Sequence, residues 1–404
     1  MGLMRKRNEA RFLAALGMTP LPMVPAKHTG GRVYFQLSTL DFRLIGGRKV
    51  FGNFTMSKIE VGILGATGMV GQRFVSLLEH HPWFEVRWLA ASDRSAGKTY
   101  GEACNWRVRD PMPKAARELT VYECKPNHAP QLLFSSLDSK VAGEVEREFA
   151  QAGHVVVSNS SNHRMEPDVP LLIPEVNPDH LALVGIQRKR RGWKGMIVTN
   201  PNCTTVGLAM SLAPLEKAFG VEKVMMTSMQ AVSGAGYPGI PTLDILGNVV
   251  PFISGEEEKV ERETQKLLGK FLDEAVKPGD FVVSAHCNRV PVEDGHTESI
   301  SVSLRTKASI EDLVEAWRKF RSLPQERNLP FAPKHPIIVR EERDRPQPKF
   351  DLAAEHGMAT VVGRVRTCPV LQFKYIALSH NTIRGAAGAA LLNAELMKSE
   401  GYLD

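Results

Sequence analysis

A regular pattern of apolar and polar positions begins near residue 58. Residues 58–64 are mostly apolar, as in a buried strand of a parallel sheet, and residues 72–80 place three apolar side chains on one face of a helix. Between them lies the glycine-rich segment GATGMVG, residues 65–71. Its glycines allow a tight turn close to a pyrophosphate, and the helix N-terminus offers unpaired N–H groups. This order of strand, glycine turn and helix predicts dinucleotide binding.

Further apolar runs at residues 85–91, 131–137 and 153–160 indicate strands. They alternate with helical patterns, which is typical of a doubly wound sheet. Polar residues follow two of these runs, so we expect small polar loops beside a cofactor there.

The residues at the end of the second strand indicate the cofactor. Ser92 and Arg94 bracket Asp93. NAD-selective sites usually place a carboxylate at this strand end, whereas a hydroxyl and a guanidinium suit a 2′-phosphate. We therefore expect NADP; Asp93 is the carboxylate that would suit NAD, and the alternative is that it faces solvent or holds the loop.

The second half of the chain has the pattern of a mixed sheet with helices on one side. Strands are expected at residues 221–229, 281–287 and 299–304, and a helix at 310–321. Residues 381–396 predict a final helix rich in Gly and Ala, whose small side chains suit close packing.

One of the five cysteines has the setting of a nucleophile. Cys203 follows a polar turn that contains Pro201 and precedes a predicted helix at residues 204–215, so a helix dipole would stabilise its thiolate. His296, at the start of an alternating strand, is the candidate general base and acid. Arg289 offers a fork for a substrate carboxylate. The other cysteines are scattered, which argues against disulfides and zinc and favours a reducing compartment.

Composition and charge narrow the function classes. Hydrophobic residues make up 43% of the 404 residues, and no apolar run is long enough to span a bilayer. The net charge of +7 arises within residues 1–57, which hold nine Lys/Arg and two Asp/Glu, and the rest is neutral. Nucleic-acid binding therefore loses its main support. The basic run at residues 187–191 is interpreted as a solvated turn.

Residues 1–57 lack clear periodicity. Our interpretation is that Met56 is the true start and that residues 1–55 are an over-extended reading frame; a disordered tail is the alternative. A transit peptide is conceivable because the segment is basic and acid-poor, but it is also Ser-poor.

Several segments together resemble one family. VGILGATGMVGQRF, AASDRSAGK, NPNCTT, QAVSGAG, GEEEK, CNRVPVEDGHTE and HNTIRGAAG follow one another from residue 58 to the C-terminus. In this order they are similar to aspartate-semialdehyde dehydrogenases of the archaeal and fungal-like branch. The resemblance implies an α/β fold class, with a Rossmann-type dinucleotide-binding domain plus an α+β catalytic and dimerisation domain.

The resemblance also implies a reaction in lysine, threonine and methionine biosynthesis. NADPH would reduce 4-aspartyl phosphate to aspartate 4-semialdehyde through a thioacyl-enzyme on Cys203, releasing phosphate, while His296 manages protons. Gln230 would orient the substrate, Arg289 would bind its α-carboxylate, and Glu256 or its neighbour would bind its ammonium group. The implied phosphate-binding residues are Arg164, Asn202 and Lys259. The expected cofactor-binding residues are Gly65, Thr67, Gly68, Met69, Val70, Gly71, Ser92, Arg94, Ser135, Ser136, Ser160 and Asn381.

Residues 58–199 are expected to form the NADP-binding domain, completed by residues 376–404, and residues 200–375 the catalytic and dimerisation domain. Family members are at least homodimers, so we expect a homo-oligomer. We also expect a cytoplasmic protein with no metal, membrane or nucleic-acid partner. Simpler interpretations remain for two residues: Glu256 could lie at a solvated helix start, and Arg164 could be a surface charge.

Other functions are possible on a related scaffold. A malonyl-CoA reductase would share Cys203 and His296 but would not need an acidic partner for an ammonium group. An N-acetyl-glutamyl-phosphate reductase acts on an acylated amine, and a glyceraldehyde-phosphate-type dehydrogenase fits the motifs around Cys203 and His296 poorly. A catalytically dead, cofactor-binding regulatory protein would not need Cys203, His296, Gln230 and Arg289 together.

Overall fold

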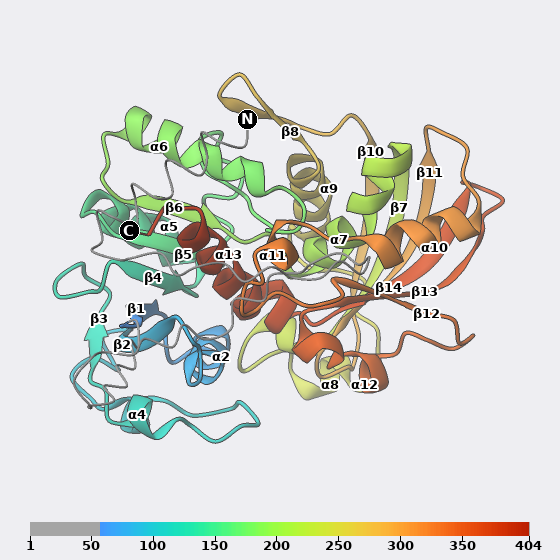
Figure 1. Cartoon of the computed structure of the whole chain (residues 1–404). Coiled ribbons are helices and arrows are strands. Elements are labelled where there is room, and N and C mark those ends of the chain that lie inside the picture. The colour runs from blue at the N-terminus through green and yellow to red at the C-terminus, as the bar shows by residue number, and fades with distance from the viewer. Residues whose placement is uncertain (1–56, 404) are drawn as a thin grey trace, which may run out of the picture. The chain divides into compact units, whose positions relative to one another are not determined.

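The structure, a computed structural model, describes residues 57–403. The expectations for the N-terminal segment, including a start at Met56, lie outside this part. Two six-stranded sheets with flanking helices organise the described residues (Figure 1). None of the helices described is long and apolar enough to cross a membrane.

All strands of the first sheet are parallel, in the order β3-β2-β1-β4-β5-β6. This is the Rossmann order, and its reversal between β1 and β4 opens a crevice at the carboxyl ends of the strands. Every residue of β4, β5 and β6 is buried, as expected for a sheet covered on both faces. The strands are β1 (Ile59–Leu64), β2 (Phe84–Ala91), β3 (Val121–Glu123), β4 (Leu132–Ser135), β5 (Val155–Ser158) and β6 (Met196–Thr199). The helices of this half are α2 (Met69–Leu78), α3 (Tyr100–Ala103), α4 (Lys114–Arg117), α5 (Ser139–Gln151), η1 (Pro178–Ala182) and α6 (Leu183–Arg191).

The basic run at residues 187–191 corrects one expectation, because it belongs to helix α6 and is not a turn. Leu183, Val184 and Gln187 bury one face of this helix, and Gly192 ends it in the left-handed conformation with φ of 67°. Four basic side chains in its last turn complement the helix dipole.

The second sheet is mixed, in the order β10-β7-β11-β14-β13-β12. β7 pairs in parallel with β10 and antiparallel with β11. Along β7 buried and exposed residues alternate, and Met225 on the open face is 52% exposed. The strands are β7 (Val221–Gln230), β10 (Val282–Arg289), β11 (His296–Leu304), β12 (Ile337–Arg340), β13 (Thr360–Thr367) and β14 (Phe373–Ser379). A separate hairpin pairs β8 (Lys270–Leu272) with β9 (Ala275–Lys277).

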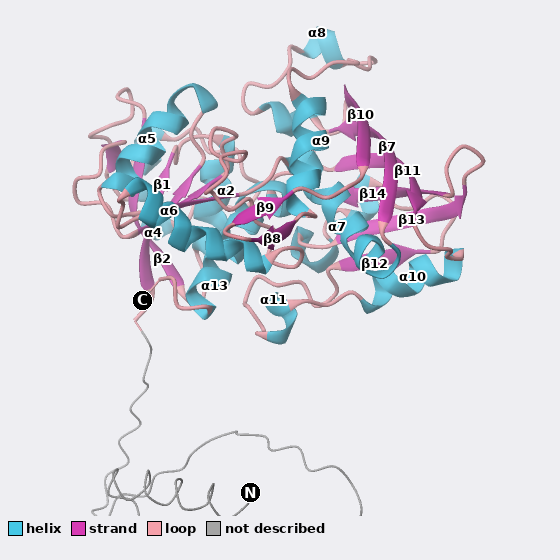
Figure 2. Cartoon of the chain, turned by 90° about the horizontal axis from the view of Figure 1, so that it is seen from above, coloured by secondary structure: helices cyan, strands magenta, loops and turns pink. Residues whose placement is uncertain are grey.

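Three longer helices pack on the second sheet: α7 (Cys203–Phe219), α9 (Glu256–Leu267) and α10 (Ile310–Lys319). Residues 204–215 of α7 are all buried, so this helix is the core of the second half. In both views α7 and α9 lie between the two sheets (Figures 1 and 2). Short helical segments complete this half: η2 (Val232–Ala235), α8 (Thr242–Ile245), α11 (Leu323–Glu326), α12 (Pro348–Asp351) and η3 (Ala354–Gly357).

The C-terminal segment returns to the first sheet, but later than the expected boundary at residue 376. β14 stays in the second sheet through Ser379. The single helix expected at residues 381–396 is in fact a π-helical turn, η4 (Ile383–Ala387), followed by α13 (Gly388–Ser399). α13 is buried over ten consecutive residues and packs near β5. Such π-turns occur frequently at functional sites.

Candidate active site

The candidate nucleophile begins the central helix. Cys203 is the first residue of α7, and the Asn202 side chain caps the helix by accepting hydrogen bonds from the backbone N–H groups of Thr204 (2.8 Å) and Thr205 (3.2 Å). Cys203 Sγ lies 3.2 Å from His296 Nε2. The structure therefore brings together the two residues that are 93 positions apart in the sequence.

His296 is fully buried, and its other ring nitrogen is also occupied. The backbone N–H of Ala231 donates to His296 Nδ1 over 3.1 Å. Because Nδ1 accepts, the hydrogen of the neutral ring must be on Nε2, which faces the sulfur. Burial, followed by the charge of Arg289, lowers the pKa of His296 to about 3. In this arrangement the neutral ring would donate from Nε2 to Cys203 Sγ, and the role of general base and acid expected for His296 stays a prediction.

Burial also opposes the thiolate expected from the helix dipole. Burial and, to a lesser extent, the nearby Glu256 carboxylate raise the pKa of Cys203 to about 12, although the charges of Arg164 and Arg289 act in the opposite direction. Desolvation disfavours the charged form more strongly than the helix N-terminus favours it. Burial therefore favours the thiol form of Cys203 over the thiolate expected from the sequence.

Two buried arginines flank the cysteine, and each has a donor without an acceptor. Arg289 Nη1 donates to Ala231 O (2.8 Å), while Arg164 donates from Nη1 to Glu263 (3.0 Å) and from Nη2 to Asn159 O (2.7 Å). Among the described residues, neither Nε has a hydrogen-bond partner. A buried unpaired donor costs roughly 1–3 kcal/mol, so each guanidinium keeps unused hydrogen-bonding capacity near Cys203. Arg164 is 7% exposed, which excludes the surface-charge interpretation.

Glu256 is buried at the start of α9, so it is not part of a solvated helix end. Its carboxylate accepts from Asn202 Nδ2 (2.9 Å) and Thr204 Oγ1 (3.4 Å). Lys259 is half-buried, with Nζ 3.8 Å from the Glu256 carboxylate. Gln230, at the end of β7, is buried and donates to Ser228 Oγ over 3.1 Å.

Two glycines that the sequence analysis did not single out allow this close packing. A Cβ at Gly385, in η4, would lie 2.8 Å from Cys203 Cβ and 2.9 Å from its Cα. A Cβ at Gly234 would lie 2.7 Å from Arg289 Nη1 and 3.1 Å from His296 Cε1. Both glycines become visible as site residues only when the chain is folded.

A cleft of about 970 Å³ lies at the carboxyl ends of the first sheet and fits a dinucleotide. The glycine turn forms one wall, and α2 begins there with no side-chain cap, which leaves its first N–H groups for an anion. Gly71 packs behind the turn, since its Cβ would lie 2.3 Å from Gly65 O. Among the expected residues, Gly65, Thr67, Gly68, Met69, Val70, Ser92 and Ser136 line the cleft.

Other expected cofactor residues lie elsewhere. Arg94 is exposed and outside the lining, whereas Asp93, expected to face solvent or hold the loop, lines the cleft; Ser135 and Ser160 are buried. Asn381 donates to Ser233 Oγ (2.8 Å) and accepts from the backbone N–H of Gly295 (2.8 Å). The lining also includes cations not predicted from the sequence, Arg107 and Lys125.

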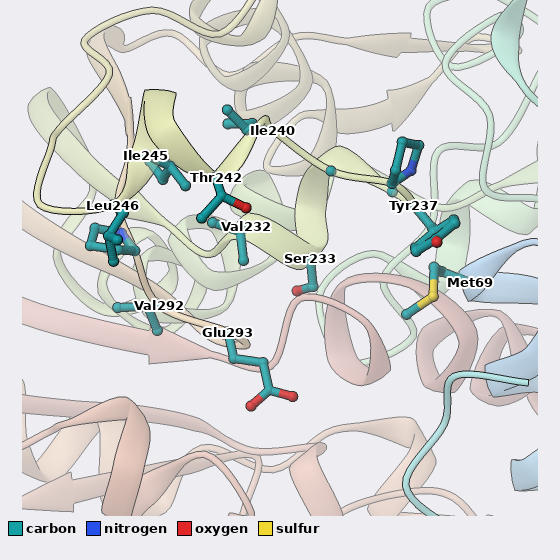
Figure 3. Close-up of a pocket in the computed structure, with 14 residues that line it drawn as sticks. Met69, Val232, Ser233, Tyr237, Ile240, Thr242, Ile245, Leu246, Val292 and Glu293 are labelled. Atoms are coloured by element: carbon teal, nitrogen blue, oxygen red, sulfur yellow. The ribbon is translucent and has the colours of Figure 1, made fainter.

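A second, mostly apolar cavity of about 460 Å³ adjoins this cleft (Figure 3). Met69 and Tyr237 line both, and the figure shows them opposite Val232, Ile245 and Leu246 across the cavity. The Arg107 guanidinium stacks 4.7 Å from the centre of the Tyr237 ring. A continuous path thus runs from the dinucleotide cleft toward the loop that follows β7.

A thiol beside a histidine, connected through the segment around Gly234 to a dinucleotide cleft, is the arrangement of an aldehyde dehydrogenase that forms a thioacyl-enzyme. Residues 60–184 match the family model of the semialdehyde dehydrogenase NAD binding domain, and residues 212–384 match that of the dimerisation domain. The chain belongs to the aspartate-semialdehyde dehydrogenase family. The dimerisation domain supports a homo-oligomer.

Two relatives and one solved structure agree with this assignment to the family. The chain is 52% identical to an aspartate-semialdehyde dehydrogenase of Methanothermobacter thermautotrophicus, over 84% of this chain and 99% of that protein. It is 44% identical to the enzyme of Saccharomyces cerevisiae, over 85% and 98%. A crystal structure of the Candida albicans enzyme with NADP superposes with a TM-score of 0.80 at 42% identity, covering 86% and 100% of the two chains. The family and fold class expected from the sequence are confirmed, and the roles of individual residues remain predictions.

Proposed function

We propose that this chain catalyses the NADPH-dependent conversion of 4-aspartyl phosphate to aspartate 4-semialdehyde and phosphate. The observation that carries the proposal is the pair of buried arginines beside Cys203, each of which makes only one or two hydrogen bonds to the described residues and so keeps further guanidinium N–H groups for an anion. A substrate with a carboxylate at one end and a phosphate at the other supplies one acceptor to each. In this assignment Arg289 binds the α-carboxylate, and Arg164, with Asn202 and Lys259, binds the phosphate.

Glu256 supports an amino-acid substrate over malonyl-CoA. It is a buried carboxylate whose negative charge acts on Cys203. An α-ammonium group would pair with this charge, whereas malonyl-CoA brings no such cation. Gln230 orients the acyl group beside the sulfur.

The first step, formation of the thioester, needs no protein side chain as a base. Cys203 Sγ attacks the acyl carbon, the new C–S bond forms as the C–O bond to phosphate breaks, and the thiol proton leaves with the phosphate. The departing phosphate oxygen becomes more basic as its bond breaks, so it can take that proton. His296 Nε2–H donates to the sulfur and then to the carbonyl oxygen as negative charge develops there.

When bound, NADPH supplies the hydride that reduces the thioester carbon. His296 stabilises the resulting alkoxide, whose collapse breaks the C–S bond and releases the aldehyde. The Cys203 sulfur then takes a proton from solvent. The residues that would hold NADPH are Gly68 with the open start of α2, for the pyrophosphate, and Ser92, for the ribose end.

Two further assignments accompany this function. We assign the open face of the second sheet, where Met225 and Val282 are 52% and 63% exposed, to a homodimer interface. Analytical ultracentrifugation that shows only monomer would contradict this assignment.

We also assign the enzyme to the cytoplasm, because all five cysteines are free and Cys203 must stay reduced. Recovery of the protein in an oxidising compartment would contradict this second assignment.

The reverse reaction offers the clearest test of the substrate. Purified protein is mixed with aspartate semialdehyde and NADP, and NADPH formation is followed with and without phosphate. We expect turnover that depends on phosphate, and none with malonyl-CoA and NADPH in the reductive direction. Turnover of malonyl-CoA together with no phosphate-dependent signal would replace this function with that of an acyl-CoA reductase.

A further inference from the structure

Helix α9 is mostly charged in sequence, yet it buries acidic and basic side chains along one face. Glu256, Val260, Glu263, Lys266 and Leu267 are buried. Their spacing places Glu256, Val260, Glu263 and Leu267 on one side of the helix. This side faces α7 and the segment that carries Arg164.

Glu263 uses each of its carboxylate oxygens for a different part of the site. Oε1 accepts from Arg164 Nη1 over 3.0 Å, and Oε2 accepts from the backbone N–H of Asn202 over 2.6 Å. The residue is 2% exposed. One carboxylate therefore joins the guanidinium beside the cysteine to the residue that immediately precedes Cys203.

Lys266, nearly one turn further along α9, binds the backbone of the segment that carries Arg164. Its Nζ donates to the carbonyl oxygens of Arg164 (2.7 Å), Glu166 (2.9 Å) and Val169 (2.9 Å). All three ammonium hydrogens are thereby used. The backbone of Arg164 is fixed by Lys266, and the direction of its guanidinium is left to Glu263 and Asn159 O.

The two partners of Glu263 depend on it to different degrees. Asn202, and with it Cys203, is also held by the side-chain cap on α7 and by the burial of that helix. The Arg164 guanidinium has only Glu263 and Asn159 O among the described residues. Loss of the carboxylate should disturb the arginine more than the cysteine.

We propose that Glu263 is a positioning residue for the phosphate half of the reaction, which fixes the Arg164 guanidinium relative to Cys203. This rests on the proposed function, in which Arg164 binds the phosphate. Buried ion pairs contribute little net stability compared with apolar packing, but they can fix a single geometry. Formation of the thioester from the aldehyde needs no phosphate and so should depend little on Glu263.

Glu263→Gln is the decisive variant, because an amide offers one acceptor oxygen where the carboxylate offers two. Only one of the two contacts can then survive. The matched control is Glu261→Gln on the same helix, whose carboxylate accepts from the backbone N–H of Ala285 (3.1 Å), away from the site. Aspartate semialdehyde and NADP are supplied, phosphate is varied, and the NADPH burst without phosphate is recorded separately.

We expect Glu263→Gln to raise the KM for phosphate about tenfold or more, the range for a lost charge-assisted hydrogen bond. The burst amplitude should match that of Glu261→Gln. Equal phosphate KM values in the two variants, or a parallel loss of burst and turnover in Glu263→Gln, would overturn the proposal. If Glu263→Gln does not fold, Glu263→Asp, which keeps both acceptors on a shorter stem, should have a higher KM for phosphate than Glu261→Gln, and equal KM values would also overturn the proposal. Absence of phosphate-dependent turnover in the unmodified protein would instead contradict the proposed function.

Discussion

Replacing Gly385 by alanine tests how closely the π-turn holds the nucleophile. The new Cβ would lie 2.8 Å from Cys203 Cβ and 2.9 Å from its Cα. Carbon atoms pack at about 3.5–4.0 Å, so the cysteine or η4 must move by roughly 0.7 Å or more. Overpacking of this kind costs about 1–3 kcal/mol of stability. A displacement near 1 Å at a reacting atom can cost about 10²-fold in rate, so we expect kcat/KM to fall roughly 10- to 100-fold.

The control for this substitution is Gly185→Ala in helix α6. A Cβ at Gly185 has no neighbouring atom within 4 Å, and alanine favours a helix over glycine by about 1 kcal/mol. Both variants are compared by kcat/KM, by thermal unfolding and by the rate at which iodoacetamide alkylates Cys203. A Gly385→Ala enzyme within twofold of Gly185→Ala in kcat/KM would refute the packing argument.

Three more predictions follow from buried polar contacts. His296→Gln should keep more activity than His296→Ala, because an amide can still donate to the sulfur; equal loss of kcat would indicate a base instead. Arg384 and Glu175 form a buried pair with contacts of 2.8 and 2.7 Å, so Arg384→Met leaves the Glu175 carboxylate unpaired. The free energy of unfolding in denaturant should fall by about 3–5 kcal/mol, and an unchanged unfolding midpoint would contradict this expectation. Since the Glu256 carboxylate raises the pKa of Cys203, Glu256→Gln should lower that pKa and speed alkylation of Cys203 at about pH 8. Slower alkylation would show that Glu256 does not raise the pKa.

The main features of the fold can be read from local patterns. Apolar runs mark β1, β4, β5 and β6, and the glycine turn marks the start of α2, because a buried parallel strand and a pyrophosphate turn each impose their own residue types. Cys203 stands out for a similar reason, since a polar turn before an apolar helix places it at a helix start. These signals need no knowledge of distant contacts.

The remaining features depend on contacts between distant residues. The α9 sequence has the polarity of a solvated helix, yet Glu256, Glu263 and Lys266 are buried against partners 54 to 102 positions away. In the sequence, Gly385 cannot be distinguished from other glycines of a helix rich in small residues. Its importance comes from the close contact between η4 and Cys203 in the fold. The neutral state of His296 likewise depends on burial and on the Ala231 N–H, neither of which its own segment indicates.

The most direct test of the central claim is to trap the thioacyl-enzyme. Protein is mixed with aspartate semialdehyde and NADP without phosphate, quenched in acid, digested and examined by mass spectrometry. We predict one equivalent of NADPH per site and an aspartyl adduct on the peptide that contains Cys203, which disappears when phosphate is added before the quench. NADPH formation with no adduct on Cys203, or undiminished formation in Cys203→Ala, would contradict covalent catalysis at this residue.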